Sequence, residues 1–392
     1  MKRDIERSDA LALRDLIHER RGRVLALIRA LVETESPSGD VQGSRAAASL
    51  LAEEAKTIST VSSVERIESP GYGEHLRIRA FDEVQEKEGS GSILMVGHTD
   101  TVHPRGSLAA RPWREEGNRI YGPGIFDMKA NCVLALEALR ALALHGLTPR
   151  HSVSIVLTCD EETGSETGRA LIEEEAARAL CAMVLEPSAS GGRVKTARKG
   201  TGIFTMEARG RAAHAGLEPE KGASAILELA RQVERLHALN DYTRGTTVNV
   251  GVISGGTRSN VVAAEARAEI DVRFSTQEEA RRIDALIREA RPFDERVQLF
   301  VSGGINRPPL ERTPGVGALY EQARSIAALL DFDLGEASVG GASDGNFIAA
   351  LGIAVLDGLG VSGDGAHATH EHIVADDIAT RGALLAGLIA TI

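Results

Sequence analysis

Residues 92–100 read SILMVGHTD, a mainly apolar run that ends in a histidine and an aspartate. A short apolar run of this kind is typical of a strand that is buried on both faces. Two later stretches have the same form: SIVLTC at residues 154–159 leads into three acidic residues, and AMVL at residues 182–185 leads into Glu186. Because ligands of open α/β sheets bind beyond the carboxyl ends of the strands, we expect these polar residues to meet at one edge of a sheet.

Helical patterns alternate with these strands. Apolar residues recur at helical spacing through residues 9–33, 127–145 and 171–180. The second stretch is followed by Gly146 and then Pro149, residue types that commonly end a helix. Strands that alternate with helices predict an α/β fold with a largely parallel sheet.

The order of the predicted elements changes after Gly200. A strand, a helix, two strands, a second helix and a last strand follow, and this order defines a ferredoxin-like unit. The first pattern returns after Pro308. We therefore predict one α/β domain formed by residues 1–199 and 309–392, with an α+β domain inserted at residues 200–308.

Composition limits the classes of function. Acidic residues outnumber basic residues 56 to 45, the formal net charge is −11, and only 3% of the 392 residues are aromatic. Such a surface repels phosphate groups and offers few rings for base stacking, so we expect no nucleic-acid partner. No window approaches the ~20 apolar residues of a membrane span, and the N-terminus lacks a secretory apolar stretch. The three cysteines are widely spaced, which indicates reduced thiols. From these features together we expect a cytoplasmic protein with no membrane partner.

Two further segments supply candidate metal ligands. Asp127 opens a predicted helix in GPGIFDMK, where glycines let the backbone turn sharply, and His367 lies in GDGAHATHEH. Taken singly, a carboxylate after a strand usually caps a helix or faces solvent. Together, two histidines and three carboxylates form the donor set that a pair of zinc-like ions needs. One shared carboxylate suits ions ~3.5–4 Å apart, so a dinuclear metal site is one hypothesis for these residues.

The motifs HTDTV, GPGIFDMK, DEETGS and LEPS, followed by a late histidine, occur in this order between residues 90 and 372. In this arrangement the sequence resembles the zinc-dependent exopeptidase family that includes bacterial glutamate carboxypeptidase, acetylornithine deacetylase, succinyl-diaminopimelate desuccinylase and the aminoacylases. The segment GGASDGNFIAALGIAVLDGLG is most similar to glutamate carboxypeptidase. The resemblance implies a metallopeptidase catalytic domain with an inserted lid domain, through which two chains form a homodimer.

The resemblance also implies two zinc ions with two ligands each and one ligand in common. His98 and Glu186 would bind one ion, and Glu162 and His367 would bind the other. Asp127 would bridge the two ions. Cobalt and manganese accept the same donor atoms, so either could replace zinc. His370 stays an alternative as the last ligand, although the spacing from His367 to Glu371 matches the family signature and favours His367.

Two more residues of these motifs receive roles from the resemblance. Asp100 would accept the other N–H of His98 and so fix the tautomer of the imidazole. Glu161 would be the general base, which takes a proton from the water that the ions share and gives it to the departing amine. The family has a cis peptide after the bridging aspartate, so we expect a cis bond between Asp127 and Met128.

Four residues outside the metal motifs are implied to serve the substrate. His214 in GRAAHAG would reach across the dimer to the oxyanion in the neighbouring active site. Asn260 in RSNVV matches an asparagine near the substrate, and Arg307 in INRPPLE resembles an arginine that grips a free carboxylate. Gly341 belongs to a glycine-rich loop whose backbone N–H groups can face the ligand.

We therefore expect an enzyme that hydrolyses the amide bond of a C-terminal or N-acylated amino acid with a free carboxylate, such as glutamate or aspartate. The alternative within the family is a deacylase of the acetylornithine or succinyl-diaminopimelate type. From another class, an inactive ligand-binding protein could use the same fold, but it would not need Glu161 beside a complete ligand set. A two-metal phosphoesterase is disfavoured, because no cluster of arginine or lysine accompanies the metal motifs.

Overall fold

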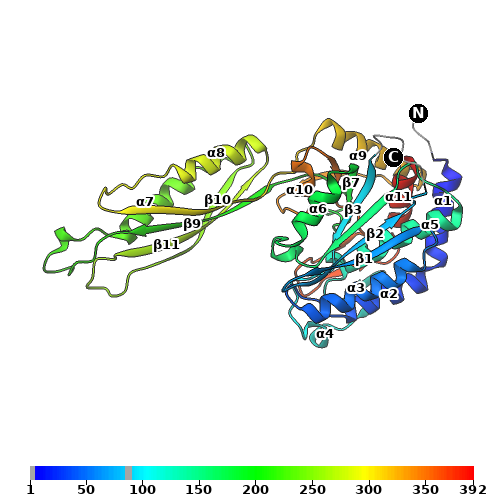
Figure 1. Ribbon diagram of the computed structural model, residues 1–392, viewed down its shortest axis with the longest axis horizontal. Coiled ribbons are helices and arrows are strands. Elements are labelled where there is room, and N and C mark those ends of the chain that lie inside the picture. Colours follow the sequence, from blue (N-terminus) through cyan, green and yellow to red (C-terminus); the bar gives the residue numbers. More distant parts are fainter. Residues whose placement is uncertain (1–4, 84–90) are drawn as a thin grey trace. The chain divides into compact units, whose positions relative to one another are not determined.

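The computed structural model describes residues 5–83 and 91–392, which divide into two compact units (Figure 1). The first unit contains the chain up to Thr196, Arg312–Val339 and Ser343–Ile392. The second unit contains Ala197–Glu311 and Gly340–Ala342. These junctions lie close to the boundaries expected at 199/200 and 308/309, and the short segment 340–342 is an addition to the second unit.

A six-stranded sheet forms the centre of the first unit. Its order is β1-β2-β6-β3-β7-β14, with strands at Val61–Ser69, Gly73–Ala80, Val153–Thr158, Ser92–His98, Ala179–Val184 and Ala354–Leu356. β6, β3, β7 and β14 pair in parallel. β2 pairs antiparallel with β6, and β1 pairs antiparallel with β2. The mostly parallel sheet expected from the sequence is confirmed, and the antiparallel pair at its edge was not predicted.

Helices cover both faces of this sheet (Figure 1). Alternate residues of β3 face opposite layers: Ile93 and Met95 join the main apolar cluster with α5 (Ala130–His145), whereas Leu94 and Val96 are buried on the other face. The remaining helices of the unit are α1 (Arg7–Glu19), α2 (Arg21–Glu33), α3 (Val41–Lys56), α4 (Ser107–Ala110), α6 (Gly168–Ala176), α9 (Pro314–Leu329), α10 (Gly345–Ala350) and α11 (Asp377–Thr391). The shorter strands are β4 (Arg114–Glu116), β5 (Arg119–Tyr121), β13 (Glu336–Val339), β15 (Gly363–Asp364) and β16 (His372–Val374). Strand β8 (Val194–Arg198) contains the boundary between Thr196 and Ala197.

Two helix boundaries differ from the sequence-based expectation. The helix expected at 171–180 spans Gly168–Ala176, because the residues from Ala179 onward pair with β3 as strand β7. The helix expected from Asp127 begins at Ala130, because Asp127 and Met128 have non-helical backbone angles. A cis peptide bond joins these two residues, which confirms the cis bond that the family resemblance implied.

The second unit has the ferredoxin-like order of elements. These are β9 (Gly200–Arg209), α7 (Ala225–His237), β10 (Thr247–Gly255), β11 (Glu265–Phe274), α8 (Gln277–Arg288) and β12 (Gln298–Arg307). All neighbouring strands are antiparallel, and the sheet order is β10-β11-β9-β12 (green to yellow in Figure 1). Leu229 of α7 and Ile283 of α8 pack with Phe204 and Ile270 of the sheet in one apolar cluster, so both helices cover the same face. Across the described parts of both units, no helix combines the length and the apolar character needed to span a membrane.

Candidate metal centre and active site

His98 is the last residue of β3, and it is 1% exposed. Its Nδ1 lies 3.0 Å from the carbonyl oxygen of Asp100 and 3.4 Å from Asp100 Oδ1. Both neighbours are acceptors, so Nδ1 carries a hydrogen and donates it toward Asp100. This arrangement fixes the ring and leaves Nε2 facing the carboxylates beyond the end of the strand.

Asp127 lies between two histidines. Its Oδ1 is 3.2 Å from His98 Nε2, and its Oδ2 is 3.3 Å from His367 Nε2. The two oxygens of one carboxylate therefore face two different imidazoles, as a ligand shared by two cations requires. The chain reaches this arrangement through the turn at Gly124, whose φ of +71° is readily adopted only by glycine.

Glu162 and His367 form the second side of the cluster. Glu162 Oε2 lies 3.1 Å from His367 Nε2. Glu162 Oε1 is buried and has no hydrogen-bond partner among the residues that the structure describes. A buried carboxylate oxygen without a donor calls for a missing partner, and a cation would supply it.

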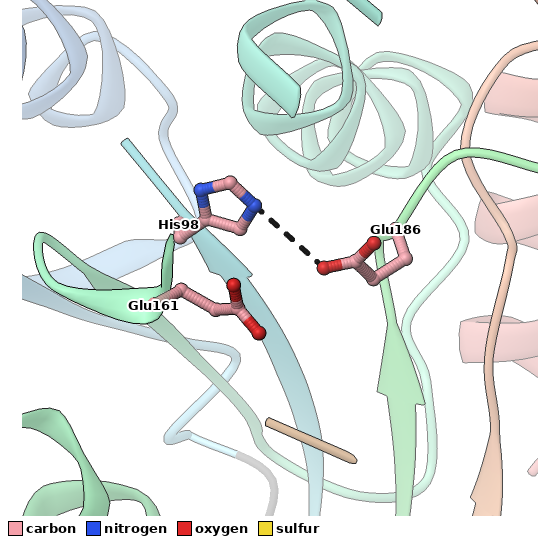
Figure 2. Close-up of side chains that lie close together, drawn as sticks. All are labelled: His98, Glu161 and Glu186. Carbon is pink, nitrogen blue, oxygen red and sulfur yellow. Dashed lines mark ion pairs between the residues drawn. The ribbon is translucent and has the colours of Figure 1, made fainter. Parts of the chain in front are cut away.

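Glu161 and Glu186 form a set of their own with His98. Glu186 is the second residue after the end of β7. Its Oε1 is 3.6 Å from His98 Nε2. Glu161 opens a short 3-10 turn after β6. Figure 2 shows the side chains of His98, Glu161 and Glu186 pointing toward one another, and one atom of each lies within 4.8 Å of the other two. His98, Asp127 and Glu162 form a second set within the same limit.

Asp100 binds the backbone of Glu161 and Glu162. Its Oδ1 accepts the backbone N–H of Glu161 and its Oδ2 accepts that of Glu162, each at 3.2 Å. The hydroxyl of Ser38 donates a further bond to Oδ2. Asp100 therefore orients both His98 and the turn that carries Glu161 and Glu162.

The electrostatics of the cluster favour positive charge. Burial lowers the pKa of His98, but hydrogen bonds to Asp100 and Asp127 raise it well above its usual range. Hydrogen bonds to Asp127 and Glu162 raise the pKa of His367 to about 10. Burial raises the pKa of Asp127, and the contacts with His367 and His98 lower it by more. Carboxylates that retain protons on two histidines would bind divalent ions in place of those protons.

His367 and His370 occupy different surroundings. His367 has a φ of +64° and a half-exposed side chain that faces Asp127 and Glu162. His370 is exposed, and its carbonyl oxygen lies 3.0 Å from His372 Nδ1. This geometry favours His367 over His370 as the late histidine of the cluster.

The four other candidates lie in the second unit. His214 is exposed, and its Nδ1 accepts the backbone N–H of Gly216 at 3.2 Å, which leaves Nε2 as the donor of a neutral ring. The carbonyl oxygen of Asn260 accepts the N–H of Ala215, so the structure brings the His214 and Asn260 segments together. Arg307 ends β12 with a buried side chain that is 9% exposed. The carbonyl oxygen of Gly341 accepts a bond from Arg198 at 3.2 Å.

Glu371 is a buried group beside the cluster to which the sequence motifs gave no role of its own. Glu371 accepts the backbone N–H of Asp127, and His103 lies 2.6 Å from its other oxygen. The spacing between His367 and Glu371 drew attention to this residue, but backbone amides as partners leave no pattern in a sequence. The four-residue spacing from His367 is the sequence signal that pointed to Glu371, and it did not reveal the role of the residue.

The fold and the site together define a class of metallopeptidases. In this class, a ferredoxin-like domain is inserted into an α/β domain that carries a cluster of histidines and carboxylates beyond its parallel strands. The profile of peptidase family M20/M25/M40 matches residues 94–391, and the chain belongs to this family. It is therefore a hydrolase that acts on amide bonds and depends on metal, as the sequence-based resemblance indicated.

Individual relatives are similar over most of the chain. Carboxypeptidase G2 of Pseudomonas sp. (strain RS-16) is 29% identical over 353 residues, which cover 88% of this chain and 83% of that protein. Succinyl-diaminopimelate desuccinylase of Ectopseudomonas mendocina is 29% identical over 331 residues, or 78% of this chain and 84% of that protein. The crystal structure of aminopeptidase PepT from Bacillus cereus has the same fold, with a TM-score of 0.79 at 24% identity, covering 95% of this chain and 98% of that one.

Proposed function

We propose that the protein is a dinuclear metal-dependent hydrolase that releases an amino acid with a free carboxylate from a peptide or an N-acyl amide. The observation that carries this proposal is the carboxylate of Asp127, with one oxygen toward His98 and the other toward His367. Glu186 and Glu162 stand beside the two histidines, so each imidazole has a second anionic partner.

The residues fit a pair of divalent cations. Glu162 Oε1 is buried and unpaired within the described part of the chain, and the donor set is limited to nitrogen and oxygen. His98 and Glu186 would hold one ion, Glu162 and His367 the other, with Asp127 between them. Zinc suits these donors, and cobalt or manganese would also be accepted. When bound, such ions make a water more acidic and polarise the amide carbonyl.

Glu161 serves as the general base. It accepts a proton from the attacking water and returns it to the nitrogen of the departing amine. The support is its position: it is 8% exposed, it lies next to His98 and Glu186, and its backbone is held by Asp100. The same proximity would also allow Glu161 to bind a metal, so the two roles must be separated by experiment.

We propose that the four candidates of the second unit recognise a substrate with a free carboxylate. Arg307 has the fork geometry for a carboxylate, Gly341 would offer its backbone to the ligand, and Asn260 would act on the substrate as the family resemblance implied. His214 donates to the oxyanion of the active site of a second chain. The similarity to carboxypeptidase G2 over 88% of the chain supports release of a C-terminal glutamate or a similar acidic residue.

The second candidate function is a deacylase of the succinyl-diaminopimelate or acetylornithine type, because a desuccinylase is 29% identical over 78% of the chain. Steady-state kinetics on the zinc-loaded protein would distinguish the two. The panel should contain peptidyl-glutamate, N-acyl amino acids, acetylornithine and succinyl-diaminopimelate, each with its carboxyl-blocked counterpart. We expect kcat/KM to be highest for peptidyl-glutamate or an N-acyl amino acid with a free α-carboxylate. A higher value for acetylornithine or succinyl-diaminopimelate would favour the deacylase instead. Cleavage of blocked substrates alone would contradict the carboxylate requirement, and no cleavage of any amide would contradict the hydrolase.

A second copy of the chain is the partner we propose. β10 is an edge strand of its sheet, and Val252 and Ile253 near its end are each 54% exposed. Ile226 and Leu227 of α7 are also exposed, at 44% and 53%. An unpaired strand edge beside exposed apolar side chains suits pairing with the same strand of another chain.

A reducing compartment such as the cytoplasm suits the thiols. Cys132, Cys159 and Cys181 are free and buried, and burial raises the pKa of each above its usual value. Thiols of this kind serve as small apolar core residues and need no oxidising environment.

A further inference from the structure

We infer, on the basis of the proposed function, that Glu371 is a positioning residue of the metal centre and that His103 and Arg111 hold it in place. None of these three side chains is among the candidate ligands. They connect the two segments that supply Asp127 and His367.

Glu371 is a buried carboxylate, 2% exposed, that collects backbone hydrogen bonds from one turn. Its Oε1 accepts the N–H groups of Phe126 at 2.9 Å and Asp127 at 3.0 Å. Its Oε2 accepts the N–H of Gly124 at 2.7 Å. Bonds to a charged acceptor are stronger than neutral ones, so this carboxylate fixes the path of the chain into Asp127. The direction of the Asp127 side chain, and thus its ability to face two histidines, depends on that path.

His103 joins Glu371 to Arg111. Its Nε2 lies 2.6 Å from Glu371 Oε2, and its Nδ1 lies 3.2 Å from Arg111 Nη2. A guanidinium can only donate, so Nδ1 is an acceptor and the ring hydrogen is on Nε2. His103 therefore acts as a neutral link that accepts one bond and donates one bond.

Arg111 extends the same network to the other ligand segment. Its Nη1 donates to the carbonyl oxygen of Ala368 at 3.3 Å, and Ala368 directly follows His367. The φ of His367 is +64°, in the left-handed region that a non-glycine residue keeps only where its surroundings hold it. One guanidinium thus supports the His367 loop directly and the Asp127 turn through His103 and Glu371.

Loss of this network should weaken metal binding even though every ligand side chain is still present. Without Glu371 or His103, Asp127 and His367 remain, but the segments that aim them lose their common anchor. Loss of a group that orients a ligand typically weakens metal affinity about 10- to 100-fold. A purely structural role would lower the thermal stability and leave the affinity of the folded protein unchanged.

The test compares the Zn²⁺ affinity of the wild type with that of three variants. The metal-free forms of wild type, Glu371→Gln, His103→Leu and His103→Gln are titrated with Zn²⁺ against a chromophoric chelator, and the absorption spectrum of the Co²⁺ form is recorded. We expect Glu371→Gln and His103→Leu to bind about 10- to 100-fold more weakly, with altered Co²⁺ bands. His103→Gln should restore nearly the wild-type affinity, because its amide also accepts one bond and donates one.

A matched control is Glu137→Gln in α5. Glu137 is also a carboxylate that is 2% exposed, but its partners are Arg20 and Arg140 rather than the metal segments. It should lower stability without changing Zn²⁺ affinity. Wild-type affinity in both Glu371→Gln and His103→Leu, or equal weakening in both His103 variants, would overturn the inference. A wild type that binds fewer than two ions would instead overturn the proposed function, and the inference with it.

Discussion

At the scale of single residues, the central feature is a carboxylate between two imidazoles from opposite halves of the chain. His98 Nε2 is 3.2 Å from Asp127 Oδ1, and His367 Nε2 is 3.3 Å from Asp127 Oδ2. Two adjacent glutamates face this arrangement from the turn after β6, and their positions differ. Glu162 contacts His367, whereas Glu161 lies near His98 and Glu186.

The two glutamates should therefore respond differently to the same substitution. Glu161→Gln removes the base and should lower kcat about 100- to 10,000-fold with both metals retained. Glu162→Gln removes a ligand and should lower the metal content itself. Metal analysis and kinetics on the same samples measure both effects. Loss of metal from Glu161→Gln would show instead that Glu161 is a ligand.

The sequence predicted the members of this cluster better than it predicted their supports. His98 is the last residue of a buried strand, and Glu161, Glu162 and Glu186 follow two others. A strand end is visible in a sequence as an apolar run that stops at polar residues. The contacts of Glu371 could not be predicted, because its partners in the Asp127 turn are backbone N–H groups. Every residue type except proline supplies such a group, so no spacing marks it.

At the scale of secondary-structure elements, α8 illustrates how one buried acid stabilises a helix start. The side chain of Thr276 caps the helix by accepting the N–H of Glu279. The Glu279 carboxylate accepts bonds from Arg282, Thr246 and Arg244. The Arg282 bond is the largest of the influences that lower the pKa of Glu279 to about 2, and burial opposes it.

The contribution of Glu279 to stability should depend on pH in a defined window. Its pKa is about 2 in the folded protein against an ordinary value of 4.5, so its stabilisation is complete above pH 4.5 and is lost as the pH falls toward 2. Glu279→Gln should cost about 1–3 kcal/mol at neutral pH, and the difference from wild type should shrink on acidification. Thermal unfolding followed by circular dichroism from pH 2 to 7 measures this difference.

The exposed neighbour Glu278 provides the control for that experiment. Glu278→Gln should lower the stability at neutral pH much less than Glu279→Gln does. A Glu279→Gln deficit that stays constant down to pH 2 would contradict the assignment.

The edge strand β10 supports a second prediction at this scale. If two chains associate through β10, a charge at Ile253 would be buried without a partner and should convert a dimer into a monomer. Light scattering after size-exclusion chromatography of Ile253→Asp measures the mass. Leu144→Asp, at a residue of α5 that is 58% exposed, serves as the control and should stay dimeric. Equal masses for wild type and Ile253→Asp would rule out this edge as the interface.

The order of elements was predictable where local patterns are strong. The ferredoxin-like unit appears in the sequence as strands and amphipathic helices of ordinary length, and the structure has them in that order. β1 and β2 were not predicted, since arginine and glutamate interrupt the apolar pattern of both strands. Arg77 of β2 pairs with Glu65 of β1 and Glu175 of α6, so long-range ion pairs replace the apolar signal there.

At the scale of the whole molecule, the net charge of −11 gives little information about the site. Asp127, Glu162 and Glu186 are three of the 56 acidic residues, and two divalent ions would more than neutralise them. A locally positive centre within an anionic protein would attract small carboxylates. The low aromatic content suits a polar amide substrate, which needs charged groups and backbone donors.

The most direct test of this account is the number of zinc ions bound per chain by wild type and by Asp127→Asn. Both proteins are made metal-free, reloaded with Zn²⁺, passed through a desalting column and measured by elemental analysis. If Asp127 is the ligand that two ions share, the wild type retains about two ions and the variant, still folded by circular dichroism, retains fewer. A wild type that retains one ion or none, or a variant that retains two, would contradict the dinuclear centre.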